Sequence, residues 1–294
     1  MKEGAAGKAI HRNEYRPYPW LLEQARFRFE IGDESTRVLA ELDFREIPTQ
    51  PGQKEVRTGD IELDGQNMEL ISVALDGAPL KAADYTLTAD HLIVHNAPES
   101  CQLALEVRIR PQENTALEGL YPSGQFLLTQ CESEGFRKIC YFPDRPDVMT
   151  RFDVTVVADR QRFPVLLSNG NAVDSGELED GRHWVRWDDP FAKPCYLFAL
   201  VAGDLACVED HFRTRSGRDV TLRFYLEHGD EDKCAHAMES LIHAMKWDED
   251  RFDLEYDLDM YHVCLLYTSP SPRDHLLHLV CRLLLEKGGG GGGG

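Results

Sequence analysis

The sequence lacks long apolar segments and has few basic residues, and both deficits narrow the classes of protein it can belong to. Its 294 residues contain 32 Lys and Arg against 51 Asp and Glu, a formal net charge of -19. Such an acidic chain is poorly suited to attract nucleic acid or an anionic membrane. It has no run of about 20 apolar residues, and residues 1–19 lack the apolar stretch of a signal peptide. We therefore expect a cytoplasmic protein that binds neither membranes nor nucleic acid.

Familiar metal-binding motifs are missing as well. The eight cysteines are scattered, without a C-x-x-C pair or a histidine at ligand spacing, which argues against a zinc knuckle and predicts reduced thiols. The sequence has no His-Glu-x-x-His. His236 and His243 fall about two turns apart on a predicted helix, which is too far for both to bind one metal ion. We predict that this chain holds no metal and no cofactor.

What the sequence does contain is a series of short runs in which apolar and charged residues alternate, separated by Gly, Pro, Asn and Asp. This pattern predicts half-buried antiparallel strands. The runs cover residues 25–32, 37–47, 61–65, 68–77, 84–96, 103–111, 152–159, 164–171 and 183–190. Residues 195–204 form a continuous apolar run, typical of a strand covered on both faces. The expected fold is mainly β, an antiparallel sandwich or saddle over residues 15–203 that follows a flexible arm at residues 1–14.

A second domain is predicted to begin over residues 204–263. Residues 211–230 indicate two strands joined at Ser216 and Gly217, and residues 231–250 indicate a helix. Apolar residues recur in this helix at helical spacing: Cys234, Met238, Leu241, Ile242 and Met245. The second domain is therefore expected to combine strands with helix.

The last segment, residues 264–294, differs in style from everything before it. The acidic, patterned sequence gives way to a Leu-rich stretch that ends in seven glycines. The segment resembles translated sequencing adapter, so we interpret it as an artefactual tail. The alternative is a genuine Leu-rich helix followed by a glycine linker.

The stretch with the clearest functional content is residues 129–152, TQCESEGFRKICYFPDRPDVMTRF. Gln130 and Glu132 follow an apolar run, and in an extended strand residues two apart point to the same face, so the amide and the carboxylate would hold a cation together. Spacing alone leaves open an ordinary exposed Gln and Glu. Cys131 between them is expected to be buried. Arg137 and residues 144–147 are predicted to form an ion-pair network that fixes the loop.

Three aromatic residues in the next part of the chain are candidates for a binding platform. They are Trp184, Trp187 and Phe191. Aromatic residues that alternate in a β domain usually belong to the core, so we predict that these do too.

The pattern Gln-x-Glu, then Arg137, then Pro-Asp-Arg-Pro-Asp at 143–147, then Phe152, resembles the hallmark of the zinc aminopeptidase N family, in its bacterial alanyl aminopeptidase branch. Segments 114–124, 166–171, 189–204 and 244–259 agree with that branch, and the resemblance covers about residues 15–260. It implies an amino-terminal β domain followed by the start of a thermolysin-like α+β catalytic domain. It also implies that Gln130 and Glu132 bind the free α-amino group of a peptide substrate.

By the same resemblance, the parent protein would be a metallopeptidase that hydrolyses peptides from their free amino terminus. Zinc would be held by a His-Glu-x-x-His motif and a distant Glu, and that motif and the family's Gly-Ala-Met-Glu-Asn motif are both absent from this sequence. The expectation is therefore an amino-terminal fragment, inactive by itself, of a monomeric cytoplasmic zinc aminopeptidase. The alternative is a non-catalytic β module, for binding or scaffolding, related to the family.

Overall fold

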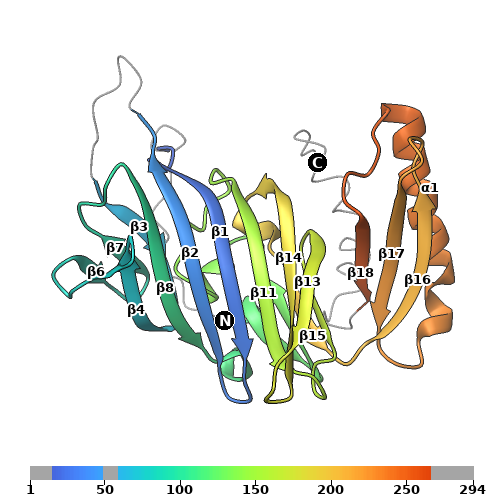
Figure 1. Ribbon diagram of the computed structural model, residues 1–294, viewed down its shortest axis with the longest axis horizontal. Helices are drawn as coiled ribbons and strands as arrows, with labels where there is room; N and C mark the ends of the chain where they lie inside the picture. The colour runs from blue at the N-terminus through green and yellow to red at the C-terminus, as the bar shows by residue number, and fades with distance from the viewer. Residues whose placement is uncertain (1–14, 49–58, 266–294) are drawn as a thin grey trace, which may run out of the picture.

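The structure is a computed structural model that describes residues 15–48 and 59–265 (Figure 1). These ranges contain four β-sheets and one α-helix. The predicted mainly β fold is confirmed. The predicted arm at residues 1–14 and residues 266–294 of the predicted tail lie outside the described residues.

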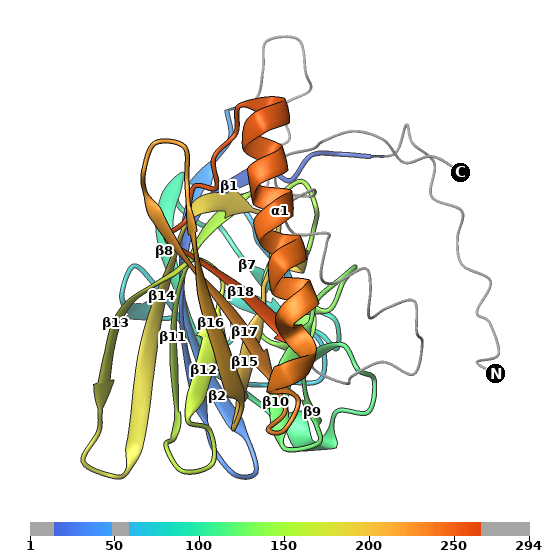
Figure 2. The same ribbon diagram turned by 90° about the vertical axis from the view of Figure 1, so that its right-hand side faces the viewer.

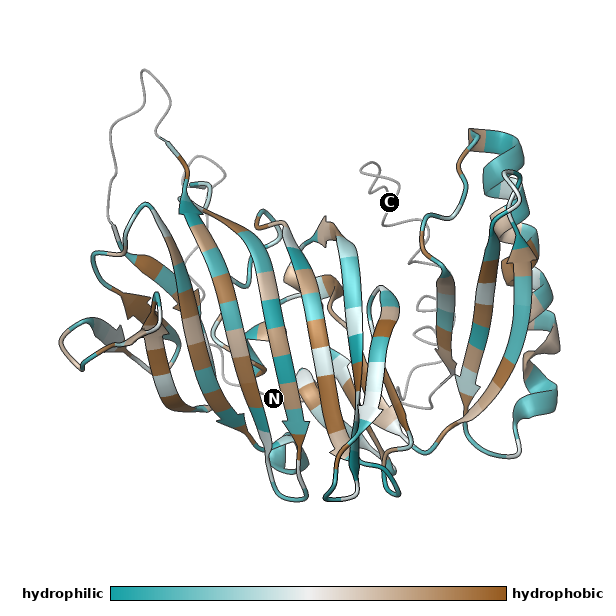
Figure 3. Ribbon diagram, in the orientation of Figure 1, coloured by the Kyte–Doolittle hydropathy of each residue, from teal (hydrophilic) through white to brown (hydrophobic). Residues whose placement is uncertain are grey.

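The largest sheet has eight strands and runs across most of the molecule (Figure 1), in the order β13-β14-β11-β1-β2-β8-β4-β5. Its strands are β1 (Trp20–Ile31), β2 (Thr36–Glu46), β4 (Glu69–Leu75), β5 (Ala78–Pro79), β8 (Ser100–Ile109), β11 (Thr150–Asp159), β13 (Asn171–Glu177) and β14 (Arg182–Lys193). β1 and β11 pair in parallel, whereas the other neighbours are antiparallel. Apolar and polar residues alternate along β1, β2 and β8 (Figure 3), so one face is buried and the other carries charge.

Two smaller sheets pack on the buried face. One has the order β12-β15-β10-β9 and the other β3-β7-β6. Their strands are β12 (Val165–Ser168), β15 (Leu200–Gly203), β10 (Phe126–Gln130), β9 (Gly119–Ser123), β3 (Ile61–Asp64), β7 (His91–Val94) and β6 (Tyr85–Leu87), joined with the short 3-10 helices η2 (Pro111–Glu113), η3 (Phe136–Lys138) and η4 (Cys195–Leu197). Residues from all three sheets share one hydrophobic core. The arrangement is the sandwich that alternation along the strands predicts.

Six phenylalanines form the centre of that core. They come from β1, η3, β11 and the loops around them: Phe27, Phe29, Phe136, Phe142, Phe152 and Phe198. The ring of Phe136 lies 4.8 Å from that of Phe142, 5.1 Å from that of Phe198 and 5.5 Å from that of Phe27, measured between centroids. Several contacts are edge-on, the geometry that the ring quadrupoles favour. Phe136 therefore ties η3 to the large sheet.

The last part of the described chain forms a separate layer at the right of Figure 1. It contains β16 (Ala206–Arg213), β17 (Asp219–Leu226), η5 (Glu231–Cys234), α1 (Ala235–Phe252) and β18 (Met260–Leu265). α1 packs along the sheet of β16, β17 and β18 (Figure 2), and its buried apolar residues belong to a second core cluster. Asn171 and Asp259 connect this layer to β13 by two reciprocal hydrogen bonds of 3.1 and 3.0 Å.

Two details differ from the sequence predictions. The run at 195–204 is not one strand, because a 3-10 turn follows Pro194 and the strand begins only at Leu200. Of the three aromatic residues predicted to be core, Trp187 is buried, whereas Trp184 is half-buried and Phe191 is exposed. Phe191 lies where the pairing of β14 with β11 becomes irregular, so the side-chain alternation is lost there.

Within the described ranges, no helix combines the length and the apolar character needed to cross a membrane.

Phe136 provides a test of the core. We expect Phe136→Ala to lower the free energy of unfolding by about 3–5 kcal/mol, because it leaves a cavity among four other phenylalanine rings. Phe252→Ala is the matched control, since that ring is 54% exposed. It should cost less than about 1 kcal/mol. Urea unfolding followed by circular dichroism measures both, and equal losses would contradict this description of the core.

Candidate functional site

The two candidate residues lie at the end of β10. Gln130 is the last residue of that strand, and Glu132 lies in the turn that follows, with an exposed side chain. The Gln130 Nε2 atom donates a hydrogen bond of 3.3 Å to the backbone oxygen of Glu132. The structure thus brings the two residues together, but the reason predicted from the sequence was wrong. They do not share the face of one strand, because the strand has ended before Glu132.

The turn that carries Glu132 is held at both of its ends. Cys131 is buried, as predicted, and burial raises the pKa of its thiol. The Gly135 N–H donates a 2.8 Å hydrogen bond to the Cys131 oxygen and closes the turn. A Cβ atom at Gly135 would lie 2.4 Å from the Gln130 oxygen, so this position requires glycine. Phe136 follows at once in the phenylalanine core, which leaves Glu132 exposed between two buried anchors.

Arg137 forms the predicted ion-pair network, and its main partner is buried. The Asp144 Oδ2 atom accepts hydrogen bonds from the Arg137 Nε atom at 2.9 Å and from the Arg137 backbone N–H at 3.1 Å. The Arg137 Nη2 atom also donates to the Asp144 backbone oxygen at 3.2 Å. The side chain of Asp144 is 1% exposed, so this pair is largely shielded from water.

Two residues that the sequence did not single out complete this network. The Asp144 N–H donates to the Asp64 Oδ2 atom at 3.1 Å, and the Cys195 thiol lies 3.1 Å from the Asp144 Oδ1 atom. Burial raises the pKa of Asp64, although the Arg137 charge acts in the opposite direction. Burial and then the Asp144 charge raise the pKa of the Cys195 thiol, so it acts as a neutral donor. Asp64 and Cys195 come from distant segments, and no local signal in the sequence marks them.

A second ion pair lies on the surface of the same loop. The Arg145 Nε atom donates to the Asp147 Oδ1 atom at 2.8 Å, and the Tyr15 hydroxyl donates to Oδ2 at 2.8 Å. Hydrogen bonding to Arg145 lowers the pKa of Asp147 to about 2. This pair ties the loop to the segment that precedes β1, and it makes no contact with the turn that carries Glu132.

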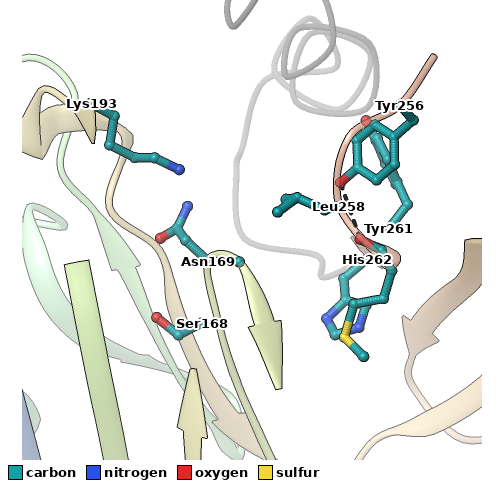
Figure 4. A pocket seen from close by; sticks show the side chains of 9 residues that line it. Ser168, Asn169, Lys193, Tyr256, Leu258, Tyr261 and His262 are labelled. Carbon is teal, nitrogen blue, oxygen red and sulfur yellow. Dashed lines mark hydrogen bonds between the residues drawn. The ribbon is translucent and has the colours of Figure 1, made fainter. Parts of the chain in front are cut away.

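A small cavity lies between the large core and the layer that holds α1 (Figure 4). Its lining includes Ser168, Asn169, Lys193, Tyr256 and His262, and its volume is about 30 Å³. That volume has room for only one or two water molecules, so the cavity is too small for a peptide. The Lys193 ammonium forms a buried ion pair with Asp189, which the sequence did not predict.

The described ranges contain no group of three or more His, Cys, Asp or Glu side chains that could hold a metal ion. His236 and His243 are both exposed on α1. The residues described here therefore do not fit a catalytic zinc site, and no catalytic step can be assigned to a metal bound by them.

Comparisons with known proteins place the chain in a family. The family model described as the Peptidase M1 N-terminal domain matches residues 49–197. Aminopeptidase N of Caulobacter vibrioides is 48% identical over 256 residues, and aminopeptidase N of Escherichia coli is 45% identical over 256 residues. Each alignment covers 87% of this chain but only 29% and 28% of the two relatives. The chain belongs to the M1 peptidase family, and it spans less than a third of the length of these relatives.

Solved structures of other proteins have a similar fold. Aminopeptidase A of Legionella pneumophila, crystallised with aspartic acid, superposes with a TM-score of 0.80 at 35% identity, covering 86% of this chain and 29% of that one. A mutant M1 zinc metallopeptidase of Deinococcus radiodurans, bound to a Tyr-Ser-Ala substrate, has a TM-score of 0.69 at 16% identity, with 86% and 58% covered. The second likeness shows the fold alone.

The Asp147 pair predicts a dependence of stability on pH. Its pKa is about 2 in the folded chain against 3.8 as the ordinary value, so the stabilisation is present above pH 3.8 and is lost as the pH falls through about 2. Asp147→Asn should therefore cost about 1 kcal/mol at pH 7, allowing for solvent screening, and progressively less as the pH falls from 3.8 toward 2.

Urea unfolding at pH 7, 4 and 2.5 measures this difference. Asp33→Asn serves as the control, because Asp33 also pairs with an arginine, Arg162, but the Asp33 side chain is 90% exposed. A loss in the Asp147 variant that stays constant over this pH range would contradict the pairing.

Proposed function

We propose that this chain is the amino-terminal portion of a zinc-dependent aminopeptidase, and that Gln130 and Glu132 supply part of the site for the substrate's α-amino group. The observation that carries the proposal is the exposed Glu132 on a turn held by buried anchors, in a chain of the M1 peptidase family. Similarity to two bacterial aminopeptidases N supports it.

The chemistry follows from the charges. A protonated α-amine and the Glu132 carboxylate form a charge-assisted hydrogen bond, which is stronger than a bond between neutral groups. The Gln130 amide nitrogen donates to the Glu132 backbone, so its carbonyl oxygen is the group that it offers to the same ammonium. A site that anchors the ammonium measures the substrate from its amino terminus. Such a site favours an exopeptidase that acts on peptides with a free amino group.

The remaining parts of the proposal concern the whole enzyme. The β domain would end near residue 203, and residues 204–263 would open the catalytic domain. Support comes from the second core cluster, which draws its members from residues 206–263. Zinc would be bound by a part of the parent protein outside this chain. A cytoplasmic location is supported by the cysteines of residues 15–48 and 59–265, which form no disulfide with one another.

A hybrid enzyme tests the proposal. In the Caulobacter vibrioides aminopeptidase N, the aligned 256 residues would be replaced by those of this chain. We expect the hybrid to release 4-nitroaniline from alanine 4-nitroanilide. Glu132→Gln should lower its kcat/KM by about 10- to 100-fold, because a charge-assisted hydrogen bond to the ammonium is lost.

Glu134→Gln is the matched control, since Glu134 is an exposed carboxylate in the same turn. It should change kcat/KM by less than about twofold, because the Glu134 side chain is 67% exposed, its contact with Arg137 is 3.6 Å long, and the shorter contacts of Arg137 with Asp144 remain. Equal kcat/KM in the Glu132 variant and in the parent hybrid would refute the assigned role. A hybrid that folds but has no activity would favour the non-catalytic module.

A further inference from the structure

Glu132 lies in the turn between Cys131 and Gly135. Directly after this turn the chain continues to Arg137, whose charged side chain is largely buried. The turn closes at Gly135, and Arg137 follows two residues later in η3. The Lys138 N–H donates to the Gly135 oxygen at 3.1 Å, so η3 and the turn share a hydrogen bond. A displacement of Arg137 is therefore transmitted to the backbone that carries Glu132.

Asp144 holds Arg137 with three contacts. Its carboxylate accepts from both the side chain and the backbone of Arg137, and its backbone oxygen accepts from the guanidinium. The Arg137 side chain is only 18% exposed, and its other acidic partners lie farther away, Glu134 at 3.6 Å and Asp64 at 4.0 Å. A neutral residue 144 would therefore leave a largely buried guanidinium with only these longer contacts, which is unfavourable, and the backbone around it is expected to move toward water.

Asp144 also connects this turn to two other elements. Its backbone N–H contacts Asp64 at the end of β3, and its carboxylate contacts the thiol of Cys195 in η4. η4 leads into β15, which pairs with β10, the strand that ends at Gln130. The buried side chain of Asp144 thus contacts η3, which follows the turn. It also contacts η4, which leads into β15, the strand that pairs with β10.

From these contacts we infer that Asp144 is a positioning residue of the α-amine site: it acts through Arg137 to hold the turn that presents Glu132. The inference rests on the proposed function of Glu132. Asp144 does not touch the substrate, since it lies 1% exposed beneath the turn. Its effect is to limit the positions that the Glu132 carboxylate can take, and a carboxylate held in one place binds an ammonium more tightly.

The first test uses the full 294-residue chain with Asp144→Asn, a change that removes the charge and nearly keeps the shape. Hydrogen exchange is read at the Gly135 and Lys138 amides by nuclear magnetic resonance. We expect both amides to exchange at least about tenfold faster, while amides in the middle of β1 keep their rates. Asp147→Asn is the control, because Asp147 lies in the same loop and makes no contact with the turn.

The second test measures amine binding by the same chains. L-alanine amide is titrated and the association constant is taken from the shift of the Glu132 amide signal. We expect Asp144→Asn to weaken binding by at least about threefold, Asp147→Asn to leave it unchanged, and Glu132→Gln to abolish it. Arg137→Lys keeps the charge but not the forked geometry, so it should fall between the parent chain and Asp144→Asn. It also carries the test if Asp144→Asn does not fold.

The outcomes separate the inference from the proposed function. If Asp144→Asn has the exchange rates and the binding constant of the parent chain, the positioning role of Asp144 is overturned. The Gly135 contacts and the burial of Phe136 would then suffice to hold the turn. Faster exchange with unchanged binding would overturn it as well. If the parent chain does not bind the probe, or if Glu132→Gln binds it equally well, the proposed function of Glu132 fails, whatever Asp144 does to exchange.

Discussion

The structure around the candidate site depends on one constraint: Phe136 must be buried in the phenylalanine core only four residues after Glu132 is exposed. A short turn has to carry the chain between these two environments. Burial of a large aromatic side chain contributes several kcal/mol, about 3–5 when it is judged by truncation to alanine. That energy holds the end of the turn in place without any contribution from Glu132.

The polar side of the same turn adds directional contacts that apolar packing cannot provide. Packing of Phe136 fixes the distance between the backbone of the turn and the core. The two hydrogen bonds from the Arg137 guanidinium to Asp144 fix the orientation of that backbone. The pair is buried, so it is less screened by salt and water than the ion pairs on the charged face of the large sheet. The turn therefore combines an apolar anchor with an oriented charged one, an arrangement that suits a binding group for a small cation.

The described residues bury their apolar side chains in two hydrophobic clusters. The first collects the inner faces of three sheets, and the second joins α1 to β16, β17 and β18. Polar groups such as Asn171 and Asp259 link the two layers. The aligned region makes up less than a third of either aminopeptidase N, so most of each relative has no counterpart in this alignment.

The sequence by itself determined most of the strands and the helix, because side-chain alternation and helical spacing are local consequences of backbone geometry. The family was indicated separately, by the resemblance of the motifs around Gln130 and Glu132. It also predicted the Arg137 network and the burial of Cys131. It could not show that β10 ends at Gln130, that Phe191 is exposed, or that Cys195 begins a 3-10 turn, since irregular pairing and core packing override local pattern. Only the tertiary structure decided the partners of Asp144, because Asp64 and Cys195 are distant in sequence and meet it only when separate sheets pack together.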